Sequence, residues 1–244
     1  MSTHAWTALA DRLVRALALE IPPIGITFTV TGPRPAVAAF DEPMSSPTED
    51  GRSGRVPASC VFWMRATADM FSTVAEDHGN CSVGRVVHGF AGLADVGGNA
   101  DVATLLGSGW VDEAAVGGMP TVADRPQFIT YGPLGEAPAD PDVILLRLDG
   151  RQLMVLTDAL PGLLVKGKPQ CHIIAVAKER GEVAVSLGCA LSRARTGMGS
   201  DEMTCAVPAH HLEALVGDVE RAAAIDNTVA AYASDDARRF VGRP

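Results

Sequence analysis

The chain has 244 residues, enough for one large domain or two closely packed ones, and 47% of them are hydrophobic. This apolar share can bury enough surface to offset the entropy lost on folding, which excludes a disordered chain. Acidic residues outnumber basic ones by 29 to 20, and the net charge of -9 argues against nucleic acid or an anionic membrane as a partner.

The first residues predict an amphipathic helix over 5–19, because leucines recur there at helical spacing with arginines between them. They do not show the basic and apolar regions of a signal peptide, and no apolar run approaches the roughly 20 residues that cross a bilayer. Five cysteines at irregular spacing indicate reduced thiols rather than a disulfide framework. We therefore expect a cytoplasmic protein without a membrane segment.

A strand is expected over 24–30, directly after two prolines that end the first helix. The proline-rich segment 32–57 predicts a long surface loop with one short strand at 36–40. Residues 59–75 fit either a strand that enters a helix or a pair of buried strands, because periodicity does not separate these for a short apolar run.

The middle of the chain, residues 82–106, is small and rich in glycine. It predicts a close-packed helix, a turn at Gly97 and Gly98, and a second helix capped by Asn99 or Asp101.

The second half predicts strands and helices that alternate with polar loops. In chain order these are strands at 127–131 and 142–148, helices at 151–160 and 171–178, a strand at 183–187, a loop at 192–201, a strand at 203–207, and helices at 209–216 and 219–232. This pattern predicts an α/β or α+β fold, a mixed sheet with flanking helices. We expect one compact unit over 1–244, either undivided or built of two intimately packed halves, 1–125 and 126–244.

The most distinctive string is EDHGNC at 76–81, which gathers two carboxylates, an imidazole and a thiol. A histidine favours the thiolate of a nearby cysteine, and a carboxylate fixes the imidazole tautomer, as in nucleophilic Cys-His catalysis. The same residues also fit a simple turn, capped by Asp77 or Asn80, in which Cys81 packs as a small hydrophobe. The local pattern leaves both interpretations open.

Three other cysteines, Cys60, Cys171 and Cys189, lie at expected element boundaries. Boundaries that face one end of a sheet can bring distant residues together, so these three and Cys81 form a candidate ligand set for a metal or an iron-sulfur cluster. Cys205 alternates like a strand residue and is expected in the core. The sequence contains no CxxC motif, nucleotide loop, serine-hydrolase elbow or zincin motif.

Several strings resemble, in the same order and over nearly the whole chain, the archaeal and bacterial domain-of-unknown-function family 169. They are Leu19–Phe28, Cys60, Ala75–Cys81, Pro141–Ile144, Cys171, Ser186–Cys189 and Met203–Val207. The family's usual Cys-Pro-Gly-Gly is Cys-Ser-Val-Gly at 81–84, and its Leu-Pro-Cys is Leu-Gly-Cys at 187–189, so both cysteines are retained. The resemblance implies a functional role for the four cysteines of the candidate ligand set, and it supplies no established reaction.

Three functions remain open. The leading hypothesis is a metalloprotein that holds a [4Fe-4S] cluster through the four cysteines, with Asp77 and His78 handling protons beside it, in redox or lyase chemistry on a small molecule. The second is a hydrolase or transferase with Cys81 as nucleophile, His78 as base and Asp77 as the group that orients the base. The third is a non-catalytic binding protein whose apolar segment 83–106 lines a pocket for a hydrophobic ligand, or for haem with His78 or Cys81 as axial ligand. A homodimer is one option for so apolar a chain.

Overall fold

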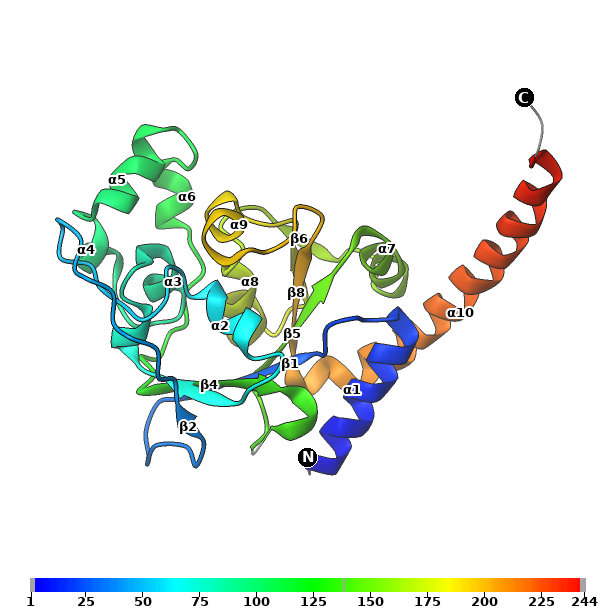
Figure 1. The fold of residues 1–244 in the computed structure, drawn as a ribbon, viewed down its shortest axis with the longest axis horizontal. Coiled ribbons are helices and arrows are strands. Elements are labelled where there is room, and N and C mark those ends of the chain that lie inside the picture. Colours follow the sequence, from blue (N-terminus) through cyan, green and yellow to red (C-terminus); the bar gives the residue numbers. More distant parts are fainter. Residues whose placement is uncertain (1–2, 138, 242–244) are drawn as a thin grey trace.

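Eight strands form one mixed sheet within the described residues, 3–137 and 139–241, in the order β2-β3-β4-β1-β5-β8-β7-β6 (Figure 1). The strands are β1 Ile24–Thr29, β2 Ala38–Ala39, β3 Phe71–Thr73, β4 Phe128–Pro133, β5 Val143–Leu148, β6 Leu164–Lys166, β7 Ala184–Ser186 and β8 Met203–Pro208. The two edge pairs, β2 with β3 and β6 with β7, are parallel, and the other neighbours are antiparallel. The mixed sheet expected from the sequence is thus confirmed.

Helices flank this sheet. The α-helices are α1 Thr3–Leu17, α2 Cys60–Arg65, α3 Ser82–Val87, α4 Leu93–Val96, α5 Ala100–Gly107, α6 Glu113–Gly117, α7 Gly150–Ala159, α8 His172–Ala175, α9 Ala190–Thr196 and α10 Leu212–Ala237. Short turns of other helix types are η1 Ala75–His78, η2 Leu134–Glu136, η3 Val176–Arg180, η4 Ala209–His211 and η5 Arg238–Phe240. Among the described residues, no helix combines the length and the apolar character needed to cross a membrane.

The central strand β5 explains how the layers are held together. It pairs with β1 on one side and β8 on the other, and all six of its residues are buried. Because successive side chains of a strand point to opposite faces, Val143 and Leu145 join the core beneath α2 and α8, whereas Ile144 and Leu146 join the core beneath α1, α7 and α10. A strand that is apolar on both faces was the clearest strand signal in the sequence.

Strands from both halves of the chain interleave in this sheet. The strand β1, from the first half, lies between β4 and β5, from the second half. The sheet is therefore continuous across the boundary near residue 125.

Three sequence predictions about elements are wrong. In 59–75 the helix α2 precedes the strand β3, and the first half of the expected loop 192–201 belongs to α9. The two helices expected over 209–232 are largely one continuous helix, α10. In contrast, the helix expected after the turn at Gly97 exists as α5, with Asn99 as its N-cap residue.

Candidate cysteine site

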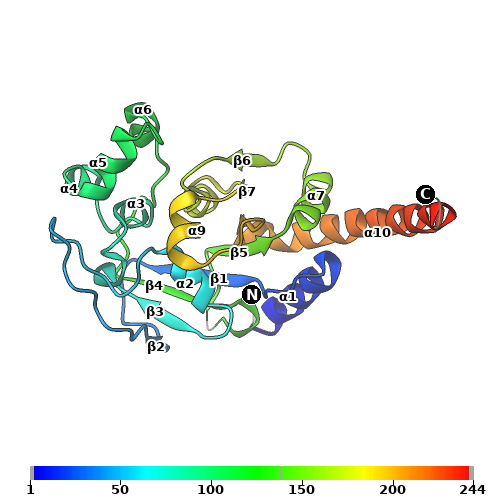
Figure 2. The ribbon, with the colours of Figure 1, turned by 45° about the horizontal axis from the view of Figure 1, so that its top comes forward.

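Four of the five cysteines stand where a short helix begins. Cys60 is the first residue of α2, and Cys81, Cys171 and Cys189 directly precede α3, α8 and α9. The helix α2 packs against α9, and α3 packs against α8. Figures 1 and 2 show α2, α3 and α9 gathered over the same face of the sheet. We call these four residues the cysteine group.

Side-chain contacts link the segments that carry the cysteine group. The Nε2 atom of Gln170, the residue before Cys171, donates a hydrogen bond of 2.7 Å to Oγ of Ser192 in the first turn of α9. Hydrogen bonds with the same two side chains favour the thiolate of Cys60, although burial outweighs them and raises the pKa of this thiol to about 12. The Cys60 thiol therefore lies beside the segments of Cys171 and Cys189.

Gly84 connects Cys60 with Cys81. A Cβ atom added at Gly84 would lie 2.3 Å from Oγ of Ser59 and 3.4 Å from Sγ of Cys81. The backbone N–H of Gly84 also donates to that Sγ atom, at 3.4 Å. The residue before Cys60 and the thiol of Cys81 thus meet at the same glycine.

The thiols of the cysteine group influence one another electrostatically. Burial raises the pKa of Cys171 well above its ordinary value, and the charges of Cys60, Cys81 and Cys189 raise it further. Burial also raises the pKa of Cys81, while the Gly84 N–H and the positive charge of Arg195 lower it. Each thiolate would be stabilised by a bound cation, because buried like charges repel one another.

Several buried polar atoms near the cysteine group lack a hydrogen-bond partner among the described residues. They include Oε1 of Gln170 and Nε2 of His172, on either side of Cys171, together with Nε of Arg85 and Nη1 of Arg195. Most buried polar groups in proteins are hydrogen-bonded, so such a concentration marks a place where a bound group would supply partners.

Within residues 3–137 and 139–241, no three His, Cys, Asp or Glu side chains are arranged to hold a single metal ion. A [4Fe-4S] cluster makes a different demand, because each of its four cysteine thiolates binds a different iron. The chemistry of the donor set, four thiols from four separate segments, fits such a cluster.

Both ring nitrogens of His78 face hydroxyl groups and not the thiol of Cys81. The ring is fully buried, with Nδ1 2.9 Å from Oγ of Ser59 and Nε2 3.0 Å from Oγ1 of Thr73. It packs between Phe62 and Phe90, at centroid distances of 4.6 and 4.7 Å. Burial lowers the pKa of His78 well below its ordinary value, so the ring is neutral. Its two hydroxyl partners make it a support for the segment that leads into Cys60.

Asp77 also has a supporting position. Its carboxylate accepts hydrogen bonds of 2.8 Å from Nε of Arg55 and from the backbone N–H of Val74. Burial raises the pKa of Asp77, although these two partners favour the carboxylate. The acidic residue of the EDHGNC string thus caps the η1 turn and holds the loop before α2, rather than orienting the ring of His78.

Asn80 also bonds to the loop that precedes α2. Its Nδ2 atom donates hydrogen bonds of 3.1 Å to the carbonyl oxygens of Gly54 and Val56. Residues 76–81 therefore hold the loop that precedes α2, and with it the segment of Cys60, next to Cys81 through hydrogen bonds.

Cys205 lies apart from the cysteine group. It is on β8, fully buried, in the core with α1 and α10. Its expected role as a core residue is confirmed.

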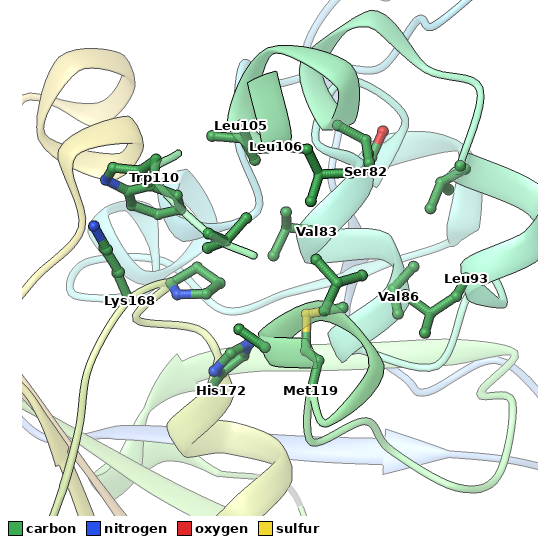
Figure 3. A pocket seen from close by; sticks show the side chains of 17 residues that line it. Ser82, Val83, Val86, Leu93, Leu105, Leu106, Trp110, Met119, Lys168 and His172 are labelled. Atoms are coloured by element: carbon green, nitrogen blue, oxygen red, sulfur yellow. The ribbon is translucent and has the colours of Figure 1, made fainter. Parts of the chain in front are cut away.

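A largely apolar pocket lies beside the cysteine group (Figure 3). Its wall comes from α3 to α6 and from the segment that precedes α8, and its cavity volume is about 150 Å³. Residues of the segment 83–106, expected to line a pocket, do so. Trp110, Met119, Lys168 and His172 also line this pocket, and no pattern in the sequence predicts that they do. The position of His172 next to Cys171 and the rarity of lysine in this chain are the signals that point toward the site.

The fold and the site thus define a class of protein in which four cysteines gather beside an apolar pocket on one face of a mixed sheet. A family model matches residues 12–218, and its family is DUF169, described as uncharacterised ArCR. The chain therefore belongs to the DUF169 family. No curated protein and no solved structure matches the chain.

Proposed function

We propose that the protein is an iron-sulfur protein that binds one [4Fe-4S] cluster through the cysteine group and acts in redox or lyase chemistry on a small molecule. One observation carries the proposal: four cysteines far apart in the sequence stand at the starts of helices that pack in pairs on one face of the sheet, α2 with α9 and α3 with α8. Four thiolates are the common ligands of such a cluster. Reduced thiols also favour the cytoplasm as the compartment.

When bound, the cluster would supply electron transfer or a Lewis-acidic iron. Ligation by all four cysteines favours the redox role, because lyase chemistry needs an iron with an open position. The chain itself contributes positive charge from Arg195, whose guanidinium acts on Cys81. The Gly84 N–H donates to the Cys81 sulfur, an interaction that raises the potential of a ligated cluster by stabilising its more negative, reduced form.

The Cys-His alternative has less support. A nucleophilic cysteine needs a lowered pKa, and burial raises the pKa of Cys81. The two ring nitrogens of His78 face the hydroxyls of Ser59 and Thr73. Haem has less support too, because a cavity of about 150 Å³ is about the size that holds benzene.

The experiment is anaerobic purification, reconstitution with iron and sulfide, and measurement of both elements and of the visible spectrum. We expect about four irons per chain and a broad absorption near about 400 nm. Cys60→Ser, Cys81→Ser, Cys171→Ser and Cys189→Ser should each lose more than about half of the iron.

Cys205→Ala is the matched control, because this cysteine is buried on the other face of the sheet. It should keep its iron, and circular dichroism of every variant checks the fold. Protein that stays free of iron after reconstitution, or equal iron loss in Cys205→Ala, would contradict the proposal.

A further inference from the structure

The pocket beside the cysteine group has the size and lining of a site for a small apolar molecule. Apolar side chains from four helices converge in it, among them Val86 and Leu105, together with Met119 from the loop after α6 and Trp110 at one side (Figure 3). The volume of about 150 Å³ equals that of an apolar cavity that accepts benzene. The part of an occupant that is held among the apolar side chains is thus about one six-membered ring.

The pocket also has a charged end. Lys168 lies at its edge, with Nζ 4.8 Å from the centroid of the Trp110 ring, and has no ion-pair partner among the described residues. His172, on the same side in Figure 3, contributes the buried Nε2 atom that lacks a hydrogen-bond partner. The hydroxyl of Ser82, in contrast, already bonds to Asp101 at 2.7 Å. An occupant with one anionic group would satisfy both Lys168 and His172.

The pocket adjoins the cysteine group through the chain itself. Ser82 and Val83, which line it, follow Cys81, and His172 follows Cys171. The wall of the pocket therefore contains the residues that follow Cys81 and Cys171, two of the proposed cluster ligands. A molecule in the pocket would lie on the other side of this wall from these cysteines.

We propose that this pocket binds a monocyclic carboxylate, with the ring among the apolar side chains and the carboxylate at Lys168 and His172. That this molecule is the substrate of the cysteine group rests on the function proposed above. Its binding does not depend on iron. A carboxylate fits because a lysine binds anions as a point charge, while the neutral ring requires an apolar cavity.

The probe is benzoate, titrated by calorimetry into the full-length chain with and without iron. We expect one benzoate per chain. Toluene, which has the ring without the charge, should bind at least about tenfold more weakly, and acetate should not bind measurably. Lys168→Met should weaken benzoate binding at least about tenfold, whereas Arg180→Met, at an exposed cation outside the pocket lining, should leave it unchanged.

A second pair of variants tests the position of the ring. Ala115 lines the pocket and Ala114, its neighbour on α6, does not. Ala115→Phe should fill the cavity and abolish benzoate binding, and Ala114→Phe should not. The absence of benzoate binding to the unmodified chain, or binding that Lys168→Met and Ala115→Phe leave unchanged, would overturn the inference.

The experiments distinguish failure of the pocket proposal from failure of the iron-sulfur proposal. Benzoate binding to a chain that cannot hold iron would leave the pocket assignment intact and remove the function proposed above. In iron-loaded protein, benzoate should change the electron paramagnetic resonance spectrum of the reduced cluster. Binding without any change in that spectrum would overturn the claim that the molecule is the substrate of the cysteine group.

Discussion

At Gly84 the chain passes between Ser59 and Cys81 with no room for a side chain. The Oγ atom of Ser59 cannot simply move away, because Ser59 is buried and its hydroxyl is 2.9 Å from Nδ1 of His78. A methyl group at position 84 would therefore displace either α3 or the start of α2, and both carry cysteines of the group.

We predict that Gly84→Ala lowers the free energy of unfolding by about 1–3 kcal/mol, the usual effect of forcing atoms into a packed interior. It should also reduce iron incorporation. Gly107→Ala is the control, since nothing lies within 4 Å of a Cβ atom there. It should not destabilise the protein, and because Gly107 is the last residue of α5 the gain should stay below the roughly 0.5–1 kcal/mol that alanine gives in the middle of a helix. Urea unfolding of both variants measures the difference, and equal stabilisation by both would contradict the packing argument.

The sequence identified the residues of the cysteine group but not the roles of their neighbours. The four thiols could be named because cysteine is rare and reactive, and because their strings resemble a family. The closeness of Asp77 and His78 to Cys81 in the chain suggested joint catalysis. In the structure His78 faces Ser59 and Thr73 instead, since neighbouring residues in a tight turn point in different directions.

At the scale of elements, α3 is tied to the core by a histidine at its end. His88 is the C-cap residue of α3, and its Nδ1 is 2.7 Å from the carbonyl oxygen of Gly84, to which it donates as a neutral ring. The ring stacks near Phe28 and His78. Burial lowers the pKa of His88 to about 4. A proton on this ring would place a charge among aromatic side chains.

This arrangement makes stability depend on pH. Between about 6.5 and about 4 the unfolded chain binds a proton at residue 88 and the folded chain does not. Above about pH 6.5, His88 should therefore not reduce the free energy of unfolding. As the pH decreases through this window, His88 should lower the free energy of unfolding by up to about 1.4 kcal/mol per pH unit.

His88→Asn keeps a donor near the Gly84 carbonyl and removes the titrating ring. Its unfolding free energy, measured in urea from pH 4 to 7, should fall less steeply than that of the unmodified chain. The difference between the two slopes should be about 1.4 kcal/mol per pH unit. His211→Asn, an exposed site, serves as the control and should keep the original slope. An unchanged slope in His88→Asn would contradict this account of His88.

Elements were predictable where local pattern and packing agree. The strand β5 is apolar along most of its length because it is buried on both faces. The helix α2 has six residues, too few to display a helical period, so its apolar run could not be separated from a strand. The helix α9 is polar, so its pattern predicts a loop from residue 192 onward, although Gly197, with φ of 75°, ends the helix in the left-handed conformation typical of helix C-termini. The exposed edge strand β6 depends on pairing with β7, which no local signal encodes.

For the whole molecule, the two faces of the sheet have different roles. One face is covered by α1, α7 and α10 in a continuous apolar core. The other carries the helices that begin at the cysteine group and the pocket beside them. The sequence predicted the class of fold, but the meeting of positions 60, 81, 171 and 189 follows from strand order. Strand order is set by long-range pairing, so a single sequence did not reveal it.

The helix α10 divides at about residue 223 into a packed and a projecting part. Its buried residues end with Val219 and Ala223, and the rest extends away from the sheet (Figures 1 and 2). Val229 and Tyr232 are 59% and 72% exposed. Arg151 reaches the helix at Asp226 and Asn227, with distances of 2.8 and 3.1 Å. The burial of α10 in the core therefore ends at Ala223, a few residues beyond the end of the family match at 218, and the polar contacts of Arg151 follow directly after it.

We predict that a chain ending at Thr228 keeps its stability, because it retains both the buried residues of α10 and the partners of Arg151. Its melting temperature should stay within about 4 °C of the full chain, the shift expected for about 1 kcal/mol in a protein of this size. A chain ending at Val216 should melt much lower, since it loses Val219 from the core. Calorimetry of both truncations at several protein concentrations measures this. A large drop in the longer truncation would mean that the projecting part is packed in solution, and a drop that depends on concentration would assign that packing to a second copy of the chain.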